Sequence, residues 1–185
     1  KKTSINENFP ISTKHPYALS KKLGEDLVIH WGEVFKLNVT SLRLFNVFGL
    51  RSRTSGAYGA VFGVFLSQKL KNKPLTIVGN GNQTRDFVYV KDVAEAFFKA
   101  SQLKENSRIL NIASGKEISV NKIANMISKN KIYIPKRPGE PDRSKANINL
   151  AKKILKWKPK ISVSEGVKIM LSNIKNWNDA PVWDR

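Results

Sequence analysis

The chain has 185 residues, 41% of them apolar and 25% charged, which is ordinary for a globular protein with one core or two small lobes. It has no cysteine, which excludes disulfides, thiolate nucleophiles and cysteine-bound metal sites. No apolar run approaches the roughly 20 residues needed to span a bilayer. We therefore expect no membrane segment and a cytoplasmic location.

The formal net charge of +19 raises the question of a nucleic-acid partner. Lysine is scattered, however, with no run longer than two and no arginine-rich stripe interleaved with aromatic residues. We expect no nucleic-acid partner. A positive field also attracts anionic metabolites, so the charge alone does not discriminate between partners.

The first part of the chain has the rhythm of a parallel α/β sheet. Residues 1–15 show no periodicity and are expected to form a loop. From Tyr17 to about Lys36, apolar residues at helical spacing predict a helix, with Pro16 in its first turn. Residues 38–45 follow at once as a predicted buried strand, which is typical of parallel sheets.

The rest of the chain continues the alternation of helices and strands. In the helix after residue 90, Val93, Ala94, Phe97 and Phe98 are expected to face inward. The sequence therefore predicts an α/β fold throughout. Strands are expected at 75–78, 85–90, 109–113 and 132–134, and helices at 61–70, 91–101, 120–128, 149–155 and 163–177.

Tyr17 and Lys21 are four residues apart at the start of a predicted helix, so they share one face. An ammonium near a tyrosine hydroxyl favours the phenolate and suits the phenol to proton transfer. The pair could be a tyrosine acid/base, or a half-exposed tyrosine beside a solvated lysine. One such spacing is near the chance frequency, so other stretches must decide between these.

Several other stretches have the order and spacing of a known family. Together they resemble the NAD-dependent epimerase/dehydratase family of extended short-chain dehydrogenase/reductases, especially its nucleoside-diphosphate-sugar 4-epimerases. The resemblance covers nearly the whole chain. It rests on residues 16–21 (Pro-Tyr-Ala-Leu-Ser-Lys), 42–51, 56–61, 84–93 (Thr-Arg-Asp-Phe-Val-Tyr-Val-Lys-Asp-Val), 111–116, 137–141 (Arg-Pro-Gly-Glu-Pro) and 157–159.

The resemblance implies the C-terminal part of a doubly wound, Rossmann-like parallel sheet interleaved with a small mixed α/β substrate lobe. Residues 1–50 and 76–115 would belong to the Rossmann-like part, and 51–75 and 116–185 to the lobe. The family's Gly-rich dinucleotide turn has no counterpart here. Nor does any hydroxyl residue lie at the family's distance before Tyr17. We therefore expect the C-terminal portion of an epimerase, lacking the N-terminal dinucleotide-binding half and inactive alone.

The resemblance also assigns roles near the cofactor. Tyr17 would be the acid/base for a sugar hydroxyl, and Lys21 would hold the nicotinamide ribose and keep the tyrosine pKa low. Phe45 would pack near the nicotinamide and Asn46 would reach the nucleotide-sugar, at the end of a parallel strand. Otherwise these two are a core aromatic residue and a turn former.

Charged residues would hold the nucleotide. Arg85 would grip the diphosphate, with a surface pair to Asp86 as the alternative. Arg137 and Glu140 would hold phosphate and the nucleotide ribose, or are solvated loop charges. Phe87 replaces a tyrosine found in many 4-epimerases, so a ribose hydrogen bond there would be missing.

The resemblance implies NAD as the cofactor. The expected partners are a nucleotide-sugar, specifically a UDP-hexose, and a second copy of the chain docked through the helix that begins at Tyr17. No metal is expected, because His15 and His30 have no carboxylate spacing suited to one. An NDP-sugar 4,6-dehydratase and a non-catalytic sugar-nucleotide-binding module remain open as alternatives.

Overall fold

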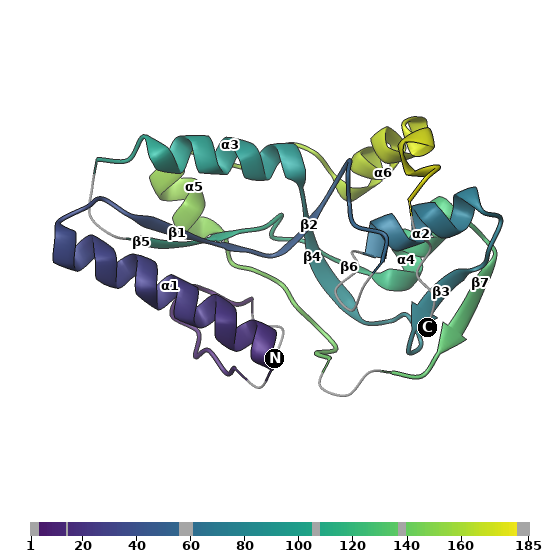
Figure 1. Ribbon diagram of the computed structural model, residues 1–185, viewed down its shortest axis with the longest axis horizontal. Helices are drawn as coiled ribbons and strands as arrows, with labels where there is room; N and C mark the ends of the chain where they lie inside the picture. Colours follow the sequence, from purple (N-terminus) through teal and green to yellow (C-terminus); the bar gives the residue numbers. More distant parts are fainter. Residues whose placement is uncertain (1–3, 14, 56–60, 105–107, 137–139, 181–185) are drawn as a thin grey trace.

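The computed structural model describes residues 4–13, 15–55, 61–104, 108–136 and 140–180 (Figure 1). Helices and short strands alternate along the chain, as the sequence predicts. In order, the elements are α1 (Pro16–Phe35), β1 (Thr40–Leu44), β2 (Asn46–Phe48), α2 (Val61–Leu70), β3 (Leu75–Val78), β4 (Thr84–Tyr89), α3 (Val90–Ser101), β5 (Arg108–Ile112), β6 (Glu117–Ser119), α4 (Val120–Ile127), β7 (Lys131–Ile134), α5 (Asn149–Leu155), α6 (Val163–Ser172) and the 3-10 helix η1 (Ile174–Trp177).

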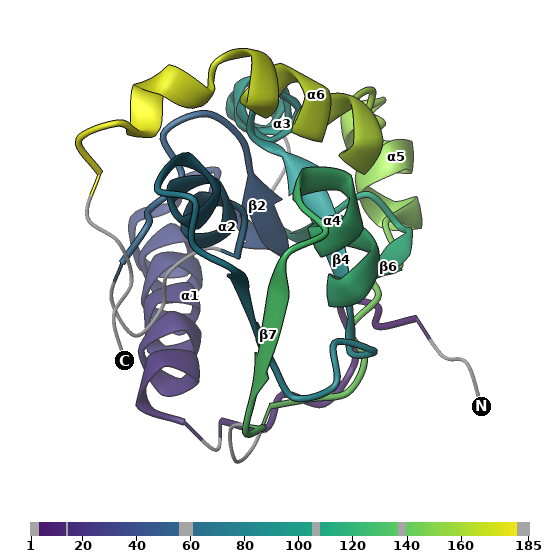
Figure 2. The same ribbon diagram turned by 90° about the vertical axis from the view of Figure 1, so that its right-hand side faces the viewer.

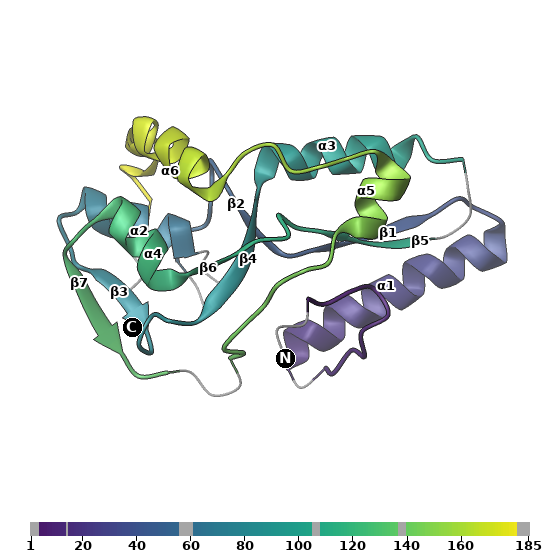
Figure 3. The ribbon, with the colours of Figure 1, turned by 180° about the vertical axis from the view of Figure 1, so that it is seen from behind.

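One half of the molecule is a parallel pair of strands covered by helices on both faces. β1 and β5 run parallel, with Leu42 opposite Leu110. Figures 1 and 3 show α1 on one face of this pair and α3 and α5 on the other. Parallel strands need such cover because both of their faces are apolar. The core between the strands, α3 and α5 includes Val93, Leu110 and Trp157.

The other half packs three helices against two small sheets. One sheet has the order β2–β4–β6, with β2 parallel and β6 antiparallel to β4. In the other, β3 and β7 pair in parallel. Figure 2 shows α2, α4 and α6 gathered around these strands. Their shared core contains an aromatic cluster in which the Phe48 ring contacts those of Phe62, Phe87 and Tyr89.

Serine caps begin two of the helices, as the sequence predicts. The Ser119 hydroxyl accepts a hydrogen bond from the Lys122 amide at 3.3 Å, and the Ser162 hydroxyl accepts one from the Glu165 amide at 3.2 Å. Each satisfies an amide that has no partner within its helix. The predicted last helix stops five residues early, at Ser172, and the chain continues as η1.

The structure differs from the predicted elements at two places. The strand expected at 38–45 is present as β1, but a second strand that was not predicted, β2, follows it directly in a different sheet. In α3, Phe97 and Phe98 are 52% and 65% exposed, and Ala94 is exposed as well. The helix packs through Val93, as predicted, and through Asp92 and Ala96. Phe97 and Phe98 thus leave an apolar surface on this helix that the described residues do not cover.

Core packing differs from the predicted division of the chain at two places. β3 packs with α2 and α4 in the second half, although 76–78 were assigned to the Rossmann-like part. α5 packs against β5, although 116–185 were assigned to the lobe.

Among the described residues, no helix combines the length and apolar character needed to cross a bilayer.

Candidate active site

Tyr17 and Lys21 lie together in the first turns of α1. The Lys21 ammonium is 5.3 Å from the centroid of the Tyr17 ring, as their spacing predicts, and Tyr17 is 51% exposed. The His15 side chain caps the helix by accepting a hydrogen bond from the Tyr17 amide at 3.3 Å. No role for His15 was predicted, although its place directly before Pro16 was a usable signal for a helix cap.

An ion pair fixes α1 against β1. The Arg43 guanidinium donates two hydrogen bonds to the Glu25 carboxylate, at 2.7 and 2.8 Å, and a third to the Glu7 carbonyl at 2.7 Å. The Arg43 hydrogen bond lowers the pKa of Glu25. Glu25 lies one and two helical turns beyond Lys21 and Tyr17, so this pair sets where α1 holds them. Sequence reasoning missed the pair because its partners come from different elements.

Phe45 and Asn46 lie where the chain passes from the β1–β5 pair to the β2–β4–β6 sheet. The Phe45 amide donates to the Ile112 carbonyl at 3.0 Å, and its partly buried ring packs against the core of the β1–β5 half. Asn46 is exposed and lies opposite Phe87 in the β2–β4 pairing. Both follow the carboxyl end of a parallel strand, where open α/β sheets bind ligands.

The structure brings Arg85 and Glu140 together from β4 and the loop after β7. Their side chains approach to 3.9 Å, and the Arg85 side chain is only 15% exposed. Burial lowers the pKa of Arg85, and the carboxylates of Glu140 and Asp142 oppose this effect. The alternative pairing of Arg85 with Asp86 is wrong, because the Asp86 carboxylate accepts hydrogen bonds from other segments. Arg137 lies outside the described residues.

Phe87 is placed in the aromatic core. It is 4% exposed, and its ring meets Phe62 edge-on, with the centroids 5.1 Å apart. The structure therefore groups Phe87 with the core rather than with Arg85. A contact between Phe87 and a nucleotide stays a prediction.

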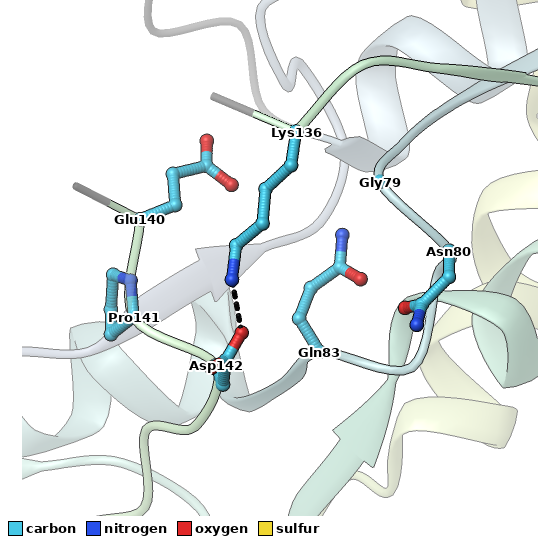
Figure 4. A pocket seen from close by; sticks show the side chains of 7 residues that line it. All are labelled: Gly79, Asn80, Gln83, Lys136, Glu140, Pro141 and Asp142. Carbon is cyan, nitrogen blue, oxygen red and sulfur yellow. Dashed lines mark hydrogen bonds and ion pairs between the residues drawn. The ribbon is translucent and has the colours of Figure 1, made fainter. Parts of the chain in front are cut away.

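A pocket of about 270 Å³ lies beside Glu140. Figure 4 shows the Lys136 side chain reaching across it to Asp142, and this ion pair lowers the pKa of Asp142. The turn on the opposite wall is held by Asn121, which donates to the Asn80 carbonyl at 2.9 Å. Lys136 was not singled out from the sequence, although it adjoins Arg137 in a proline-rich loop. The lining residues are Gly79, Asn80, Gln83, Lys136, Glu140, Pro141 and Asp142.

The candidate site thus consists of two groups. A tyrosine–lysine pair lies at the start of the helix beside the parallel strands, and an arginine–carboxylate pair with a polar pocket lies in the other half. In the described part of the chain, no cluster of three or more His, Cys, Asp or Glu side chains is arranged to hold a metal ion. The fold and these groups define a Rossmann-like α/β protein with the side chains of acid/base chemistry and anion binding.

Comparison with known proteins identifies the family. The profile of the NAD dependent epimerase/dehydratase family matches residues 1–113, and the chain belongs to this family. It is 39% identical over 180 residues to a putative UDP-glucose 4-epimerase of Methanocaldococcus jannaschii, covering 94% of this chain and 58% of the relative. It is also 30% identical over 175 residues to UDP-glucuronic acid decarboxylase 1 of Arabidopsis thaliana, covering 90% of this chain and 39% of the relative.

A solved structure agrees with the fold. The crystal structure of a UDP-glucuronic acid 4-epimerase from Bacillus cereus, in complex with UDP-glucuronic acid and NAD, matches with a TM-score of 0.85 and 32% identity. The match covers 95% of this chain and 57% of that one. The chain therefore spans about half the length of the proteins it resembles, and its Rossmann-like class is confirmed.

Proposed function

We propose that this chain acts as the C-terminal portion of an NAD-dependent nucleotide-sugar epimerase that inverts C4 of a UDP-hexose. The observation that carries the proposal is the pairing of Tyr17 with Lys21 on one exposed face of α1. The names of the relatives support a UDP-sugar as the substrate class. The partial coverage of those relatives supports a role as one portion of a longer protein.

Tyr17 would exchange the proton of the sugar C4 hydroxyl. The Lys21 ammonium, 5.3 Å from the centroid of the Tyr17 ring, would hold the phenol oxygen in place for this proton transfer. The His15 cap and the Glu25–Arg43 pair hold the helix that carries both groups. This arrangement supplies the positioning that a proton transfer requires.

Three side chains of this chain suit the nicotinamide end of NAD. Tyr17 and Lys21 would present hydrogen-bonding groups to its ribose, and Phe45 would offer an aromatic ring at a strand end. NAD, when bound, supplies a hydride acceptor and donor. An alkoxide formed by loss of the hydroxyl proton is the better hydride donor, which is why a base beside the cofactor matters.

The nucleotide would bind in the other half. The Arg85 guanidinium, with its planar fork of donors, suits a diphosphate, and the Glu140 carboxylate suits ribose hydroxyls. Asn46 is exposed at the junction of the halves, where it can reach the sugar. Phe87 and Arg137 stay in the proposed set on the family resemblance alone.

We also propose that the chain pairs with a second copy through α1. Large apolar side chains recur every four residues along the side of this helix away from β1, and they are 45–59% exposed. A stripe of this kind on a helix usually packs against another helix. The stripe consists of Leu19, Leu23, Leu27, Trp31 and Phe35.

The division into two parts is retained as a proposal, with the changes that core packing suggests. β3 would move to the substrate lobe and α5 to the Rossmann-like part. The exposed Phe97 and Phe98 of α3 would then face the dinucleotide-binding half that the family resemblance implies. A cytoplasmic location is proposed from the cysteine-free composition.

Product analysis distinguishes the candidate activities. The complete protein containing this chain is incubated with NAD and either UDP-glucose or UDP-glucuronic acid, and the products are resolved by NMR. We expect conversion of UDP-glucose to its C4 epimer. Release of CO₂ from UDP-glucuronic acid would favour the decarboxylase activity named for one relative. A 4-keto-6-deoxy product would favour a dehydratase, and binding without turnover a non-catalytic module.

A further inference from the structure

Asp86 is a fully buried carboxylate that joins three segments of the chain. One oxygen accepts hydrogen bonds from the amide and the hydroxyl of Ser114, at 2.8 and 2.6 Å. The other accepts from the amides of Gly115 and Ala146, at 3.0 and 3.1 Å. Burial raises the pKa of Asp86, and these four donors act in the opposite direction. The carboxylate therefore ties β4 to the turn after β5 and to the segment around Ala146.

That segment, residues 142–148, is named the strap here. Figure 3 shows it running from the loop after β7, along the back of the molecule, to α5. It is hydrogen-bonded to Thr84, whose amide donates to the Asp142 carbonyl at 2.9 Å and whose carbonyl accepts from the Ser144 amide at 3.1 Å. Asp86 holds the same strap two residues further along β4.

Arg85 lies between these two points of attachment. Neighbouring side chains on a strand point to opposite sides, so Arg85 projects toward Glu140 while Asp86 points inward. Glu140 lies two residues before the strap begins. The hydrogen bonds of Thr84 and Asp86 therefore attach the strap to β4 on both sides of Arg85. They hold the backbone of Arg85 and the backbone that follows Glu140 in fixed positions relative to each other.

We propose that Asp86 is a positioning residue for nucleotide-diphosphate binding, because its carboxylate fixes Arg85 and the strap behind Glu140 in one arrangement. This inference rests on the function proposed above. An asparagine has nearly the same shape but only one acceptor oxygen, so it leaves either the Ser114 donors or the Gly115 and Ala146 amides without a partner. Asp86→Asn should loosen the strap while the core of the chain stays intact.

Asp92 supplies a matched control. It is 3% exposed, and its carboxylate accepts a hydrogen bond from the Ile161 amide at 3.0 Å, on a segment that belongs to neither β4 nor the strap. Asp92→Asn should lower the melting temperature, as Asp86→Asn should, without changing nucleotide affinity. The comparison separates a positioning role from a general loss of stability.

The test is calorimetric titration of the 185-residue chain and its variants with UDP and with uridine. Loss of hydrogen bonds to a buried charged group predicts a fall in UDP affinity of about tenfold or more for Asp86→Asn. The fall should be smaller for uridine, because Arg85 acts on the diphosphate. Ser114→Ala removes one of the four donors and should weaken UDP binding by about two- to fivefold, even if Asp86→Asn does not fold.

Two negative outcomes are distinguishable. Unchanged UDP affinity in a folded Asp86→Asn, or in Ser114→Ala, would overturn the role of Asp86 alone. A failure of the unaltered chain to bind UDP would contradict the proposed function and the role of Asp86 together.

Discussion

Gly24 and Gly166 are both helical glycines, yet their surroundings predict opposite effects of an added methyl group. A Cβ at Gly166 would lie 2.4 Å from the Phe48 ring, which is packed among Phe62, Phe87 and Tyr89. Because this aromatic cluster cannot yield easily, Gly166→Ala should lower the free energy of unfolding by about 1–3 kcal/mol. Urea denaturation measures the change.

Gly24→Ala is the control. Nothing lies within 4 Å of a Cβ at Gly24, and its position in α1 is regular helix. Alanine should therefore raise the free energy of unfolding by about 0.5–1 kcal/mol through its higher helix propensity. A stabilising effect of Gly166→Ala would show that the aromatic cluster is not packed as described.

The Glu25–Arg43 pair makes stability depend on pH. The pKa of Glu25 is lowered in the folded state, first by the Arg43 hydrogen bond. Glu25 therefore takes up a proton at a higher pH in the unfolded chain, near its ordinary pKa of about 4.3, than in the folded chain. The ion pair stabilises the fold above that pH, and the stabilisation is lost as the pH falls through the lower pKa that Glu25 has in the folded chain. Thermal melting from pH 6 down to pH 3 measures the loss.

Glu25→Gln isolates this contribution. The variant should be less stable than the unaltered chain at pH 6, because it leaves the Arg43 charge without its partner. The difference should narrow as the pH falls and Glu25 becomes protonated. A difference that stays constant over this range would mean that ionisation of Glu25 does not stabilise the fold.

At the scale of elements, α1 is the least buried long helix. Its inner face meets β1 through Glu25 and Gly32, and its outer face carries the apolar stripe from Leu19 to Phe35. Leu27→Lys places a charge in the middle of that stripe and should weaken self-association by at least about tenfold, because burying an unpaired ammonium is costly. Analytical ultracentrifugation of the chain measures the dissociation constant.

Glu33→Lys alters an exposed residue outside the stripe and should leave the dissociation constant unchanged. If the unaltered chain is monomeric at high concentration, or if Leu27→Lys associates as tightly as the unaltered chain, the proposed pairing through α1 is wrong.

Elements with strong local signals could be predicted from the sequence, and contacts between elements could not. The caps at Ser119 and Ser162 and the bounds of α2 and α5 follow from residues close in the chain. β6 has three residues and was not predicted, since it exists only by pairing with β4.

The same distinction applies to the candidate site. Tyr17 and Lys21 meet because i and i+4 share a helix face, which the sequence predicts. Arg85 and Glu140 were both assigned through the family resemblance, but their approach depends on how the strap is attached to β4. Asp86 was considered only as a surface partner of Arg85, because burial of a charged residue cannot be read from its neighbours in the chain.

At the scale of the whole molecule, the two halves divide the proposed chemistry between them. The parallel pair β1–β5 with α1 carries the acid/base pair, and the half built on β3, β4 and β7 carries the anion-binding side chains. The chain crosses between them where β1 leads into β2, β4 into α3, β5 into β6 and α5 into α6, and along the strap. This division suits a substrate whose sugar and nucleotide are recognised separately.

The measurement that tests the central claim most directly is the rate of C4 inversion of UDP-glucose by the complete protein carrying Tyr17→Phe, with NAD present. Removing only the hydroxyl of the proposed acid/base should slow the reaction by about 10²- to 10⁴-fold, while UDP affinity stays unchanged because the proposed UDP-binding pair, Arg85 and Glu140, lies outside α1. Turnover by Tyr17→Phe at the rate of the unaltered protein would contradict the account.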